Sequence, residues 1–325
     1  MRTAVIGVGY LGRFHAHKYA DLPGAELVAV VDTDTHTRDS VAAELGVTGF
    51  SDYRELAGKV DAVSVAVPTT AHYEVARFML EHGIHVLVEK PITASVAQAQ
   101  ALIDLAQRKQ CCLQVGHLER FNAAYRELEQ IVQQPMFIES NRVAPFKPRG
   151  TDVSVVLDLM IHDIDIIQCL LKSPLQHLDA SGVSVLSDEI DIANARLHFA
   201  DGCVANVTAS RVSFKTERRM RFFQRDTYVS VDFHERSLAL HRKGSREMSP
   251  GIPEIISNHM ILEQDDPLRE EISAFVDCVR HRQPPLVTGE HGRDALATAM
   301  RIGDMLDAAA VPRNGSSTRP GAGKR

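Results

Sequence analysis

The chain has 325 residues, of which 44% are hydrophobic and 24% charged, and its formal net charge is -6. A chain of this length and composition can form two compact domains that each bury a core, which excludes a disordered or fibrous protein. The acidic balance gives no reason to expect a nucleic-acid partner. We therefore expect a small-molecule ligand.

The cysteines and the N-terminus bear on where the protein works. Five cysteines stand at positions 111, 112, 169, 203 and 278, and none forms a Cys-x-x-Cys pair, so we expect reduced core or surface thiols. The N-terminal apolar run is too short for a signal peptide, and no stretch approaches the roughly 20 apolar residues of a membrane span. We expect a cytoplasmic protein with no membrane partner.

The first third of the chain alternates short β-rich runs with longer helical patterns. Strands are expected at 3–6, 26–31, 62–67, 85–88 and 112–115, and helices at 13–20, 40–45, 72–82 and 95–109. Such repeated βα units predict an α/β fold with a parallel sheet. This first domain is expected to span residues 1–118.

The pattern changes after about residue 120 to longer alternating strands, which are typical of an antiparallel sheet. Strands are expected at 137–143, 194–199, 204–210 and 227–232, and helices at 123–133, 155–171, 267–281 and 290–308. We expect a second, α+β domain over 119–310 with a large, mostly antiparallel open sheet. The Pro/Gly/Ser-rich tail 311–325 is predicted to be disordered.

A glycine motif follows the first expected strand and opens the first helix. In that context G-x-G-x-x-G is the dinucleotide fingerprint of a Rossmann domain, because its glycines make the turn, admit the pyrophosphate and let helix and sheet pack closely. The residues expected at the cofactor here are Gly7, Gly9, Tyr10, Leu11 and Gly12. Asp32, 20 residues past Gly12, would bind the ribose hydroxyls and repel a 2′-phosphate, which favours NAD over NADP.

Two alternatives stay open for this motif. The glycines could form a turn that only packs, with Asp32 capping the next helix. The same fingerprint also serves FAD, although the additional segments usual in such FAD proteins are missing from this sequence.

Further chemistry-bearing residues follow in chain order. Lys90 comes directly after an expected strand, where strand ends point toward the cofactor crevice, so its ammonium could polarise or protonate a hydroxyl under hydride transfer. Asp158, His162 and Asp165 are spaced to share one face of the helix expected at 155–171. We also expect Pro68, Thr69, His72 and Glu89 at the cofactor.

Structural alternatives exist for each of these residues. Lys90 could be a surface lysine, His162 a satisfied core histidine, Asp165 a helix cap and His72 an ordinary first-turn residue. Asp158, His162 and Asp165 have ligand-capable side chains, but a catalytic zinc usually adds Cys or further His ligands. We expect no metal.

The order GxGxxG, VPT with His72, EKP and DxxxHxxD resembles the Gfo/Idh/MocA oxidoreductases, up to about residue 310. The resemblance implies a Rossmann domain, a second domain whose open sheet forms homodimer or homotetramer contacts, and redox chemistry at a sugar or cyclitol hydroxyl carbon. By motif position, Lys90, Asp158 and His162 match the family's catalytic residues. His162 would be the general acid or base, since its usual pKa near 6.5 suits proton exchange. Lys90 would stabilise the alkoxide, and Asp158 would orient the hydroxyl or His162.

The sequence departs from the family pattern at Met160, where many members carry glycine, and we expect this side chain to narrow the pocket. The strings GHLERFN and LDLMIHDID are similar to the branch that oxidises the 3-hydroxyl of UDP-N-acetylglucosamine, which implies a role in lipid A biosynthesis. Glu119, Arg120 and Asn122 are then expected to line the substrate cleft together with Asp165.

The stretch Arg211 to Arg225 is rich in lysine and arginine against one glutamate. Its arginines could bind a diphosphate, because a guanidinium matches phosphate oxygens, or they could form a solvated strand face or an oligomer contact. The leading interpretation of the chain is a nucleotide-sugar dehydrogenase. A dehydrogenase of a free sugar, inositol or dihydrodiol and a non-catalytic NAD(H)-binding regulator are the alternatives.

Overall fold

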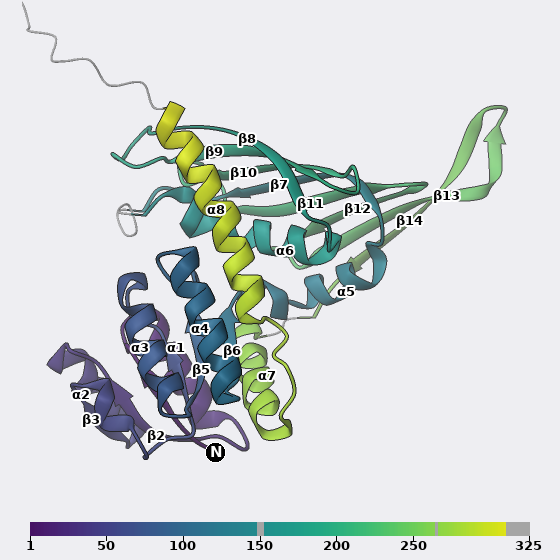
Figure 1. The fold of residues 1–325 in the computed structure, drawn as a ribbon. Helices are drawn as coiled ribbons and strands as arrows, with labels where there is room; N and C mark the ends of the chain where they lie inside the picture. The colour runs from purple at the N-terminus through teal and green to yellow at the C-terminus, as the bar shows by residue number, and fades with distance from the viewer. Residues whose placement is uncertain (148–152, 264–265, 310–325) are drawn as a thin grey trace, which may run out of the picture.

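A six-stranded parallel sheet organises the N-terminal part of the computed structural model, which describes residues 1–147, 153–263 and 266–309. The strand order is β3-β2-β1-β4-β5-β6 (Figure 1). This is the doubly wound Rossmann order, whose direction reverses beside β1 and opens a crevice at the carboxyl ends of the strands. The strands are β1 (Arg2–Ile6), β2 (Glu26–Val31), β3 (Thr48–Phe50), β4 (Ala62–Val65), β5 (His85–Glu89) and β6 (Leu113–Gly116).

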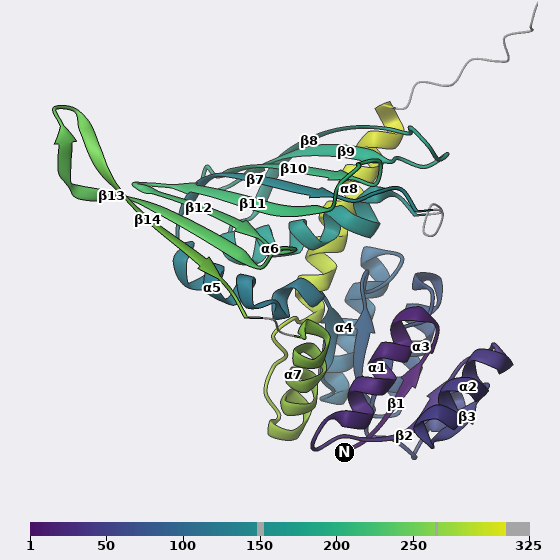
Figure 2. The same cartoon turned by 180° about the vertical axis from the view of Figure 1, so that it is seen from behind.

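Helices cover both faces of this sheet. The strands are buried on both sides, which explains their continuous apolar runs. The helices are α1 (Tyr10–Asp21), α2 (Thr35–Leu45), α3 (Thr69–Glu81) and α4 (Val96–Lys109), with a 3₁₀ turn η1 (Tyr53–Leu56). α7 (Pro267–His281), far along the chain, returns to pack against α1 (Figure 2). The parallel sheet predicted from the sequence is therefore confirmed.

The second sheet has eight strands in the order β14-β13-β12-β11-β7-β10-β9-β8. Every neighbouring pair is antiparallel except β7 with β10. The strands are β7 (Pro135–Val143), β8 (Leu175–Val183), β9 (Ile192–Phe199), β10 (Val204–Ser210), β11 (Glu217–Gln224), β12 (Thr227–Asp232), β13 (Ser237–Ser249) and β14 (Ile252–Ile261). The mostly antiparallel sheet is thus also confirmed, with β8, β11, β13 and β14 as strands beyond those predicted.

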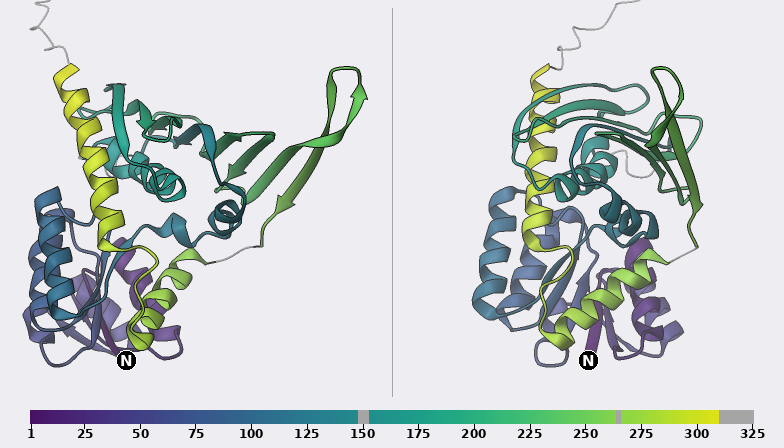
Figure 3. Two further views of the ribbon diagram at one scale, coloured as in Figure 1. Left: turned by 45° about the vertical axis from the view of Figure 1, so that its right-hand side comes forward. Right: turned by 90° about the vertical axis from the view of Figure 1, so that its right-hand side faces the viewer.

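Alternating burial along these strands gives the sheet two different faces. One face packs against helices, and the other is open (Figure 3). The elements on the covered face include α5 (Ala123–Ile131), α6 (Ile161–Leu171) and α8 (Gly289–Ala309). Within the described part of the chain, no helix is both long and apolar enough to span a bilayer.

The helix predicted over 155–171 is not uniform. Its first part is a π turn, η3 (Val156–Met160), and α6 begins at Ile161. π turns of this kind recur at functional sites, and this one carries Asp158. The spacing argument for a single α-helical face was therefore wrong for its first turn, because the period changes there.

The junction between the two sheets runs through a 3₁₀ turn, η2 (Leu118–Phe121), that follows β6. A division at residue 118 stays a prediction, since α7 returns to the first sheet and Thr288 forms a bridge with Gln114 of β6. The predicted tail 311–325 lies outside the described residues.

Candidate functional site

The glycine turn between β1 and α1 has the shape of a dinucleotide cradle. Gly7 has a φ of 83°, and a Cβ on it would lie 2.7 Å from the Ala66 carbonyl oxygen. A Cβ on Gly12 would lie 1.7 Å from the Gly7 carbonyl oxygen, so only glycine fits either position. A Cβ on Gly9 would meet nothing within 4 Å. This open space at the N-terminus of α1 fits a pyrophosphate approaching the backbone.

Asp32 follows β2 and faces the same turn. Its carboxylate accepts hydrogen bonds from the backbone nitrogens of Val8 and Asp34, both at 2.9 Å. The cap of α2 is Asp34, which accepts from the nitrogen of Thr37, so the alternative in which Asp32 caps this helix is wrong. A carboxylate has about four acceptor sites, which leaves Asp32 able to accept ribose hydroxyls as well.

The other predicted cofactor residues flank this cradle or support it from behind. Tyr10 is 66% exposed and Leu11 37% exposed, at the start of α1. Pro68 caps α3, and Thr69 is its first residue. His72 is buried, and its two ring nitrogens each lie 2.9 Å from a carbonyl oxygen, those of Pro91 and Val67. His72 therefore ties together the loops after β4 and β5 and has no ring nitrogen available to a ligand.

Lys90 and Asp158 meet at the junction of the two sheets. The Lys90 ammonium donates to the backbone oxygen of Asp158 at 2.7 Å and lies 3.5 Å from its Oδ1. Burial lowers the pKa of Lys90, and the charge of Asp158 partly opposes that shift. The structure thus brings Lys90 and Asp158 together, whereas the sequence suggested that Asp158 orients the substrate hydroxyl or His162.

His162 lies beside this pair and is held neutral. Burial lowers its pKa well below the usual 6.5, and the charges of Lys90 and Arg142 lower it further. Its Nδ1 is buried without a hydrogen-bond partner among the described residues. Its ring meets that of His117 edge to face at 6.4 Å. A neutral imidazole with an unused nitrogen can accept a proton from a hydroxyl.

Two arginines form ion pairs with carboxylates next to the site. Arg142 on β7 bridges Glu119 at 2.8 Å and Asp163 at 2.7 Å, all three buried. Arg218 on β11 adds a second contact to Glu119 at 3.1 Å. Burial raises the pKa of Glu119, but Arg142 and Arg218 outweigh that effect and leave the pKa below its usual range. Removing one partner of such a buried pair typically costs about 3–5 kcal/mol.

The remaining predicted substrate residues are largely internal. Arg120 is 2% exposed, lies 3.5 Å from Asp165 and stacks over the ring of Tyr125 at 4.8 Å. Asp165 also faces His117, 3.9 Å away. Asn122 is buried and caps α5 by accepting from the nitrogen of Ala124. These side chains shape the junction between the sheets, and their contact with a substrate stays a prediction.

Met160 does not narrow the pocket as expected. Its side chain is fully buried in the core under the eight-stranded sheet. The π turn points it inward, while Asp158 on the same turn is half exposed. The departure from the family pattern at this position therefore affects core packing.

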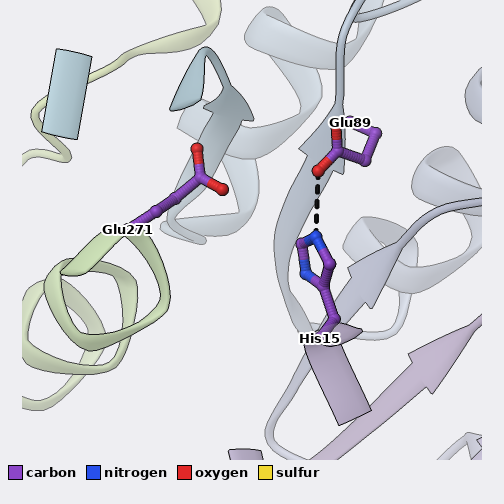
Figure 4. Close-up of side chains that lie close together, drawn as sticks. All are labelled: His15, Glu89 and Glu271. Atoms are coloured by element: carbon purple, nitrogen blue, oxygen red, sulfur yellow. Dashed lines mark hydrogen bonds and ion pairs between the residues drawn. The ribbon is translucent and has the colours of Figure 1, made fainter. Parts of the chain in front are cut away.

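Glu89 points into the protein and joins a buried network behind Lys90 (Figure 4). One of its carboxylate oxygens lies 2.9 Å from His15 Nε2, and His15 Nδ1 lies 3.2 Å from the Ser64 hydroxyl. The Glu271 carboxylate, from α7, comes within 4.8 Å of both Glu89 and His15. Both Glu271 oxygens are buried and unpaired among the described residues, and burial followed by the charge of Glu89 raises its pKa well above the usual 4.5. Burial and the negative charge of Glu89 therefore both favour the protonated, neutral form of the Glu271 carboxyl.

Four residues of this region were not predicted from the sequence: His117, Arg142, Asp163 and Glu271. His117 belongs to the GHLERFN segment, so the sequence already placed it next to the expected substrate residues. Arg142 and Asp163 give no local signal, because their pairing joins β7 to α6. Glu271 looks like one more acidic residue on an amphipathic helix until the fold places it behind β5.

Replacing Glu271 with glutamine tests this protonation. A folded-state pKa above the unfolded value contributes stability that is fully present below about pH 4.5 and is lost as the pH rises through the folded pKa, by about 1.4 kcal/mol per unit. Glu271→Gln is neutral at every pH. We expect its free energy of unfolding in urea to exceed that of the wild type at pH 9, with the difference shrinking toward pH 5.

The exposed neighbour provides the control, because Glu270→Gln on the same helix should follow the wild type at every pH. A Glu271→Gln variant that is less stable than the wild type at pH 9 would contradict a neutral carboxyl. It would point instead to an ionised Glu271 held by a cation between His15, Glu89 and Glu271.

Comparisons with known proteins agree with this geometry. Residues 1–117 match the model of the oxidoreductase family with an NAD-binding Rossmann fold, and residues 126–227 match the GFO/IDH/MocA C-terminal domain. The chain is 40% identical to UDP-N-acetylglucosamine 3-dehydrogenase of Acidithiobacillus ferrooxidans over 93% of this chain and 96% of the relative. A solved structure of that enzyme superposes with a TM-score of 0.90 over 95% of this chain and 98% of the other.

A more distant relative is scyllo-inositol 2-dehydrogenase (NAD(+)) of Bacillus subtilis, 27% identical over 89% of each chain. Two family models together match more than half of this chain, and a relative of 40% identity covers almost all of it. The chain is thus an oxidoreductase that belongs to the Gfo/Idh/MocA family, with its NAD-binding Rossmann domain.

Proposed function

We propose that this enzyme oxidises the 3-hydroxyl of UDP-N-acetylglucosamine with NAD as the hydride acceptor. The observation that carries the chemistry is the meeting of Lys90, Asp158 and His162 at the carboxyl ends of the Rossmann strands. The substrate is inferred from the 40% identity to the nucleotide-sugar enzyme, compared with 27% to the inositol enzyme. A role of the product in lipid A biosynthesis is part of the same proposal.

The proposed mechanism assigns one task to each of these side chains. NAD, when bound, supplies the acceptor for the hydride. Neutral His162 takes the proton from the sugar hydroxyl, and the Lys90 ammonium stabilises the negative charge that develops on that oxygen. Asp158 holds Lys90 in place through its backbone oxygen and its carboxylate. The carboxylate of Asp32 favours NAD over NADP, since it would repel a 2′-phosphate.

One arginine of the basic stretch 211–225 is the best candidate to bind the diphosphate, because side chains alternate between the two faces of a strand. Side chains at 218, 220 and 222 share one face of β11, and buried Met220 and Phe222 identify it as the covered face. Arg218 is therefore on the side of the site, and its charge is one of those that lower the pKa of His162. Its side chain is 45% exposed beside Glu119, which leaves guanidinium donors for phosphate oxygens.

Three other arginines of the stretch have structural partners. Arg211 pairs with Asp191, Arg219 with Asp232 and Arg221 with Glu139. Arg219 and Arg221 alternate with Arg218 and so lie on the open face of the sheet.

A homodimer or homotetramer through the second sheet stays part of the proposal. The open face and the projecting β13–β14 arm offer surface for a second copy (Figure 1). Large apolar side chains more than half exposed on this arm are Met248, Ile252, Ile255 and Ile256, and Ile261 follows at 89%. Several large exposed apolar side chains on one arm favour an interaction site there.

Purified protein with NAD and UDP-N-acetylglucosamine is expected to produce NADH absorbance. Lys90→Met and His162→Ala should each lower kcat at least about 100-fold while NAD still binds, because each variant removes a group needed to stabilise charge or accept the proton. Lys109→Met, on the exposed side of α4, is the control and should retain wild-type turnover. Turnover of inositol alone would favour the alternative substrate, and no turnover across nucleotide sugars, inositols and hexoses would refute the proposal.

The pH dependence of kcat/KM for oxidation is expected to be bell-shaped. His162 must be neutral to accept a proton, and its pKa is lowered, so the acid limb should lie below pH 6.5. Lys90 must be charged, and burial lowers its pKa, so the alkaline limb should fall below pH 10.5. An acid limb above pH 6.5 would show that His162 is not the neutral base inferred here.

Arg218→Ala is expected to raise KM for UDP-N-acetylglucosamine about tenfold with little change in kcat, because it removes a charged contact to a non-reacting part of the substrate. Arg219→Ala, which loses a similar side chain from the opposite face, should leave KM unchanged. Equal effects of the two variants would argue against a diphosphate contact at Arg218.

A further inference from the structure

Cys112 and Cys278 lie side by side although they are 166 residues apart in the sequence. Their Sγ atoms are 2.9 Å from each other. A disulfide bond is about 2.05 Å long, so the sulfur atoms need to approach by less than about 1 Å for a bond to form. Cys112 directly precedes β6, the edge strand of the parallel sheet, and Cys278 lies near the end of α7.

Both residues are held in place by their surroundings. The backbone nitrogen of Cys112 donates to His85 Nδ1 at 2.8 Å, and the Cys278 thiol donates to the Gln283 carbonyl oxygen at 2.6 Å. Neighbouring Cys111 turns elsewhere, with its thiol 3.7 Å from the Lys109 carbonyl oxygen. The pairing is therefore specific to Cys112 and Cys278.

A small oxidant can reach this pair. Cys112 is partly exposed, whereas Cys278 is 6% exposed. Both line a cavity of about 670 Å³ whose other walls include His85, Gln283 and Pro284. This cavity lies between β6, α4 and the segment after α7, and none of Lys90, Asp158 and His162 lines it.

We propose that Cys112 and Cys278 are a redox-sensitive pair that forms a reversible intramolecular disulfide when the protein meets a peroxide. One thiol is oxidised to a sulfenic acid as the peroxide O–O bond breaks, releasing one water. The second sulfur then attacks the first, its proton leaves with the hydroxyl as a second water, and the S–S bond closes. Two thiols and one hydrogen peroxide thus give one disulfide and two waters, and a dithiol reductant reverses the reaction.

The bond would fasten α7 to the first sheet. α7 already packs there through buried Ile272, Phe275 and Val276, and it carries Glu271 into the network behind Lys90. A link across 166 residues strongly restricts the unfolded chain. The oxidised protein should therefore unfold at a temperature several °C higher, whatever the substrate of the enzyme proves to be.

The test uses the full chain, reduced, freed of reductant and treated with hydrogen peroxide. We expect the thiols that react with Ellman's reagent in denaturant to fall from five to three. A digest should contain a cross-linked Cys112–Cys278 peptide, lighter by two hydrogen atoms than the two separate peptides. Tm should rise on oxidation, and dithiothreitol should restore both the thiol count and Tm.

Variants identify the bond. Cys112→Ser and Cys278→Ser should each abolish the cross-link and the rise in Tm, whereas Cys111→Ser should retain both. Because Cys278 is the more buried, Cys112→Ser keeps the test valid if Cys278→Ser does not fold. Five reactive thiols after peroxide treatment, a cross-link through Cys111, or a cross-link only between two chains would overturn the proposal.

Discussion

The contact between Lys90 and Asp158 is the interaction on which the arrangement of the site depends. It joins the end of β5 in one sheet to the π turn that precedes α6 under the other. The Lys90 end of the contact is fixed on both sides, by the pairing of Glu89 with His15 and by His72 at the Pro91 carbonyl oxygen. The contact therefore links the Rossmann sheet to the turn that precedes α6, which carries His162.

Burial and charge act together on this site. The Lys90 side chain is 20% exposed, and its positive charge adds to the effect of burial in lowering the pKa of His162. Asp158 favours the charge on Lys90, and no comparable carboxylate pairs with His162 among the described residues. The result is a division of roles between a cation and a neutral base, which is the combination that hydroxyl oxidation requires.

Local patterns predicted the first sheet, and they indicated Lys90 as a candidate, because each depends on a short segment. Gly7 and Gly12 are required by contacts within one turn, and Lys90 is placed by its strand end. β11 was not among the expected strands, although a strand face was one interpretation of Arg218 and its neighbours, and apolar Met220 and Phe222 alternate with them. β13 and β14 were missed for a different reason: beyond buried Leu238 and Leu240 their side chains are mostly exposed, so burial imposes little alternation on them.

Pairings between distant segments were beyond the reach of sequence patterns. Glu89 was expected at the cofactor because it adjoins Lys90, yet its carboxylate points to His15 inside the protein. Successive side chains of a strand point to opposite faces of the sheet. At the end of β5, only one of the two neighbours Glu89 and Lys90 can therefore point into the cofactor crevice. Lys90 therefore points into the crevice and Glu89 into the interior, where its charge and burial raise the pKa of the neighbouring Glu271.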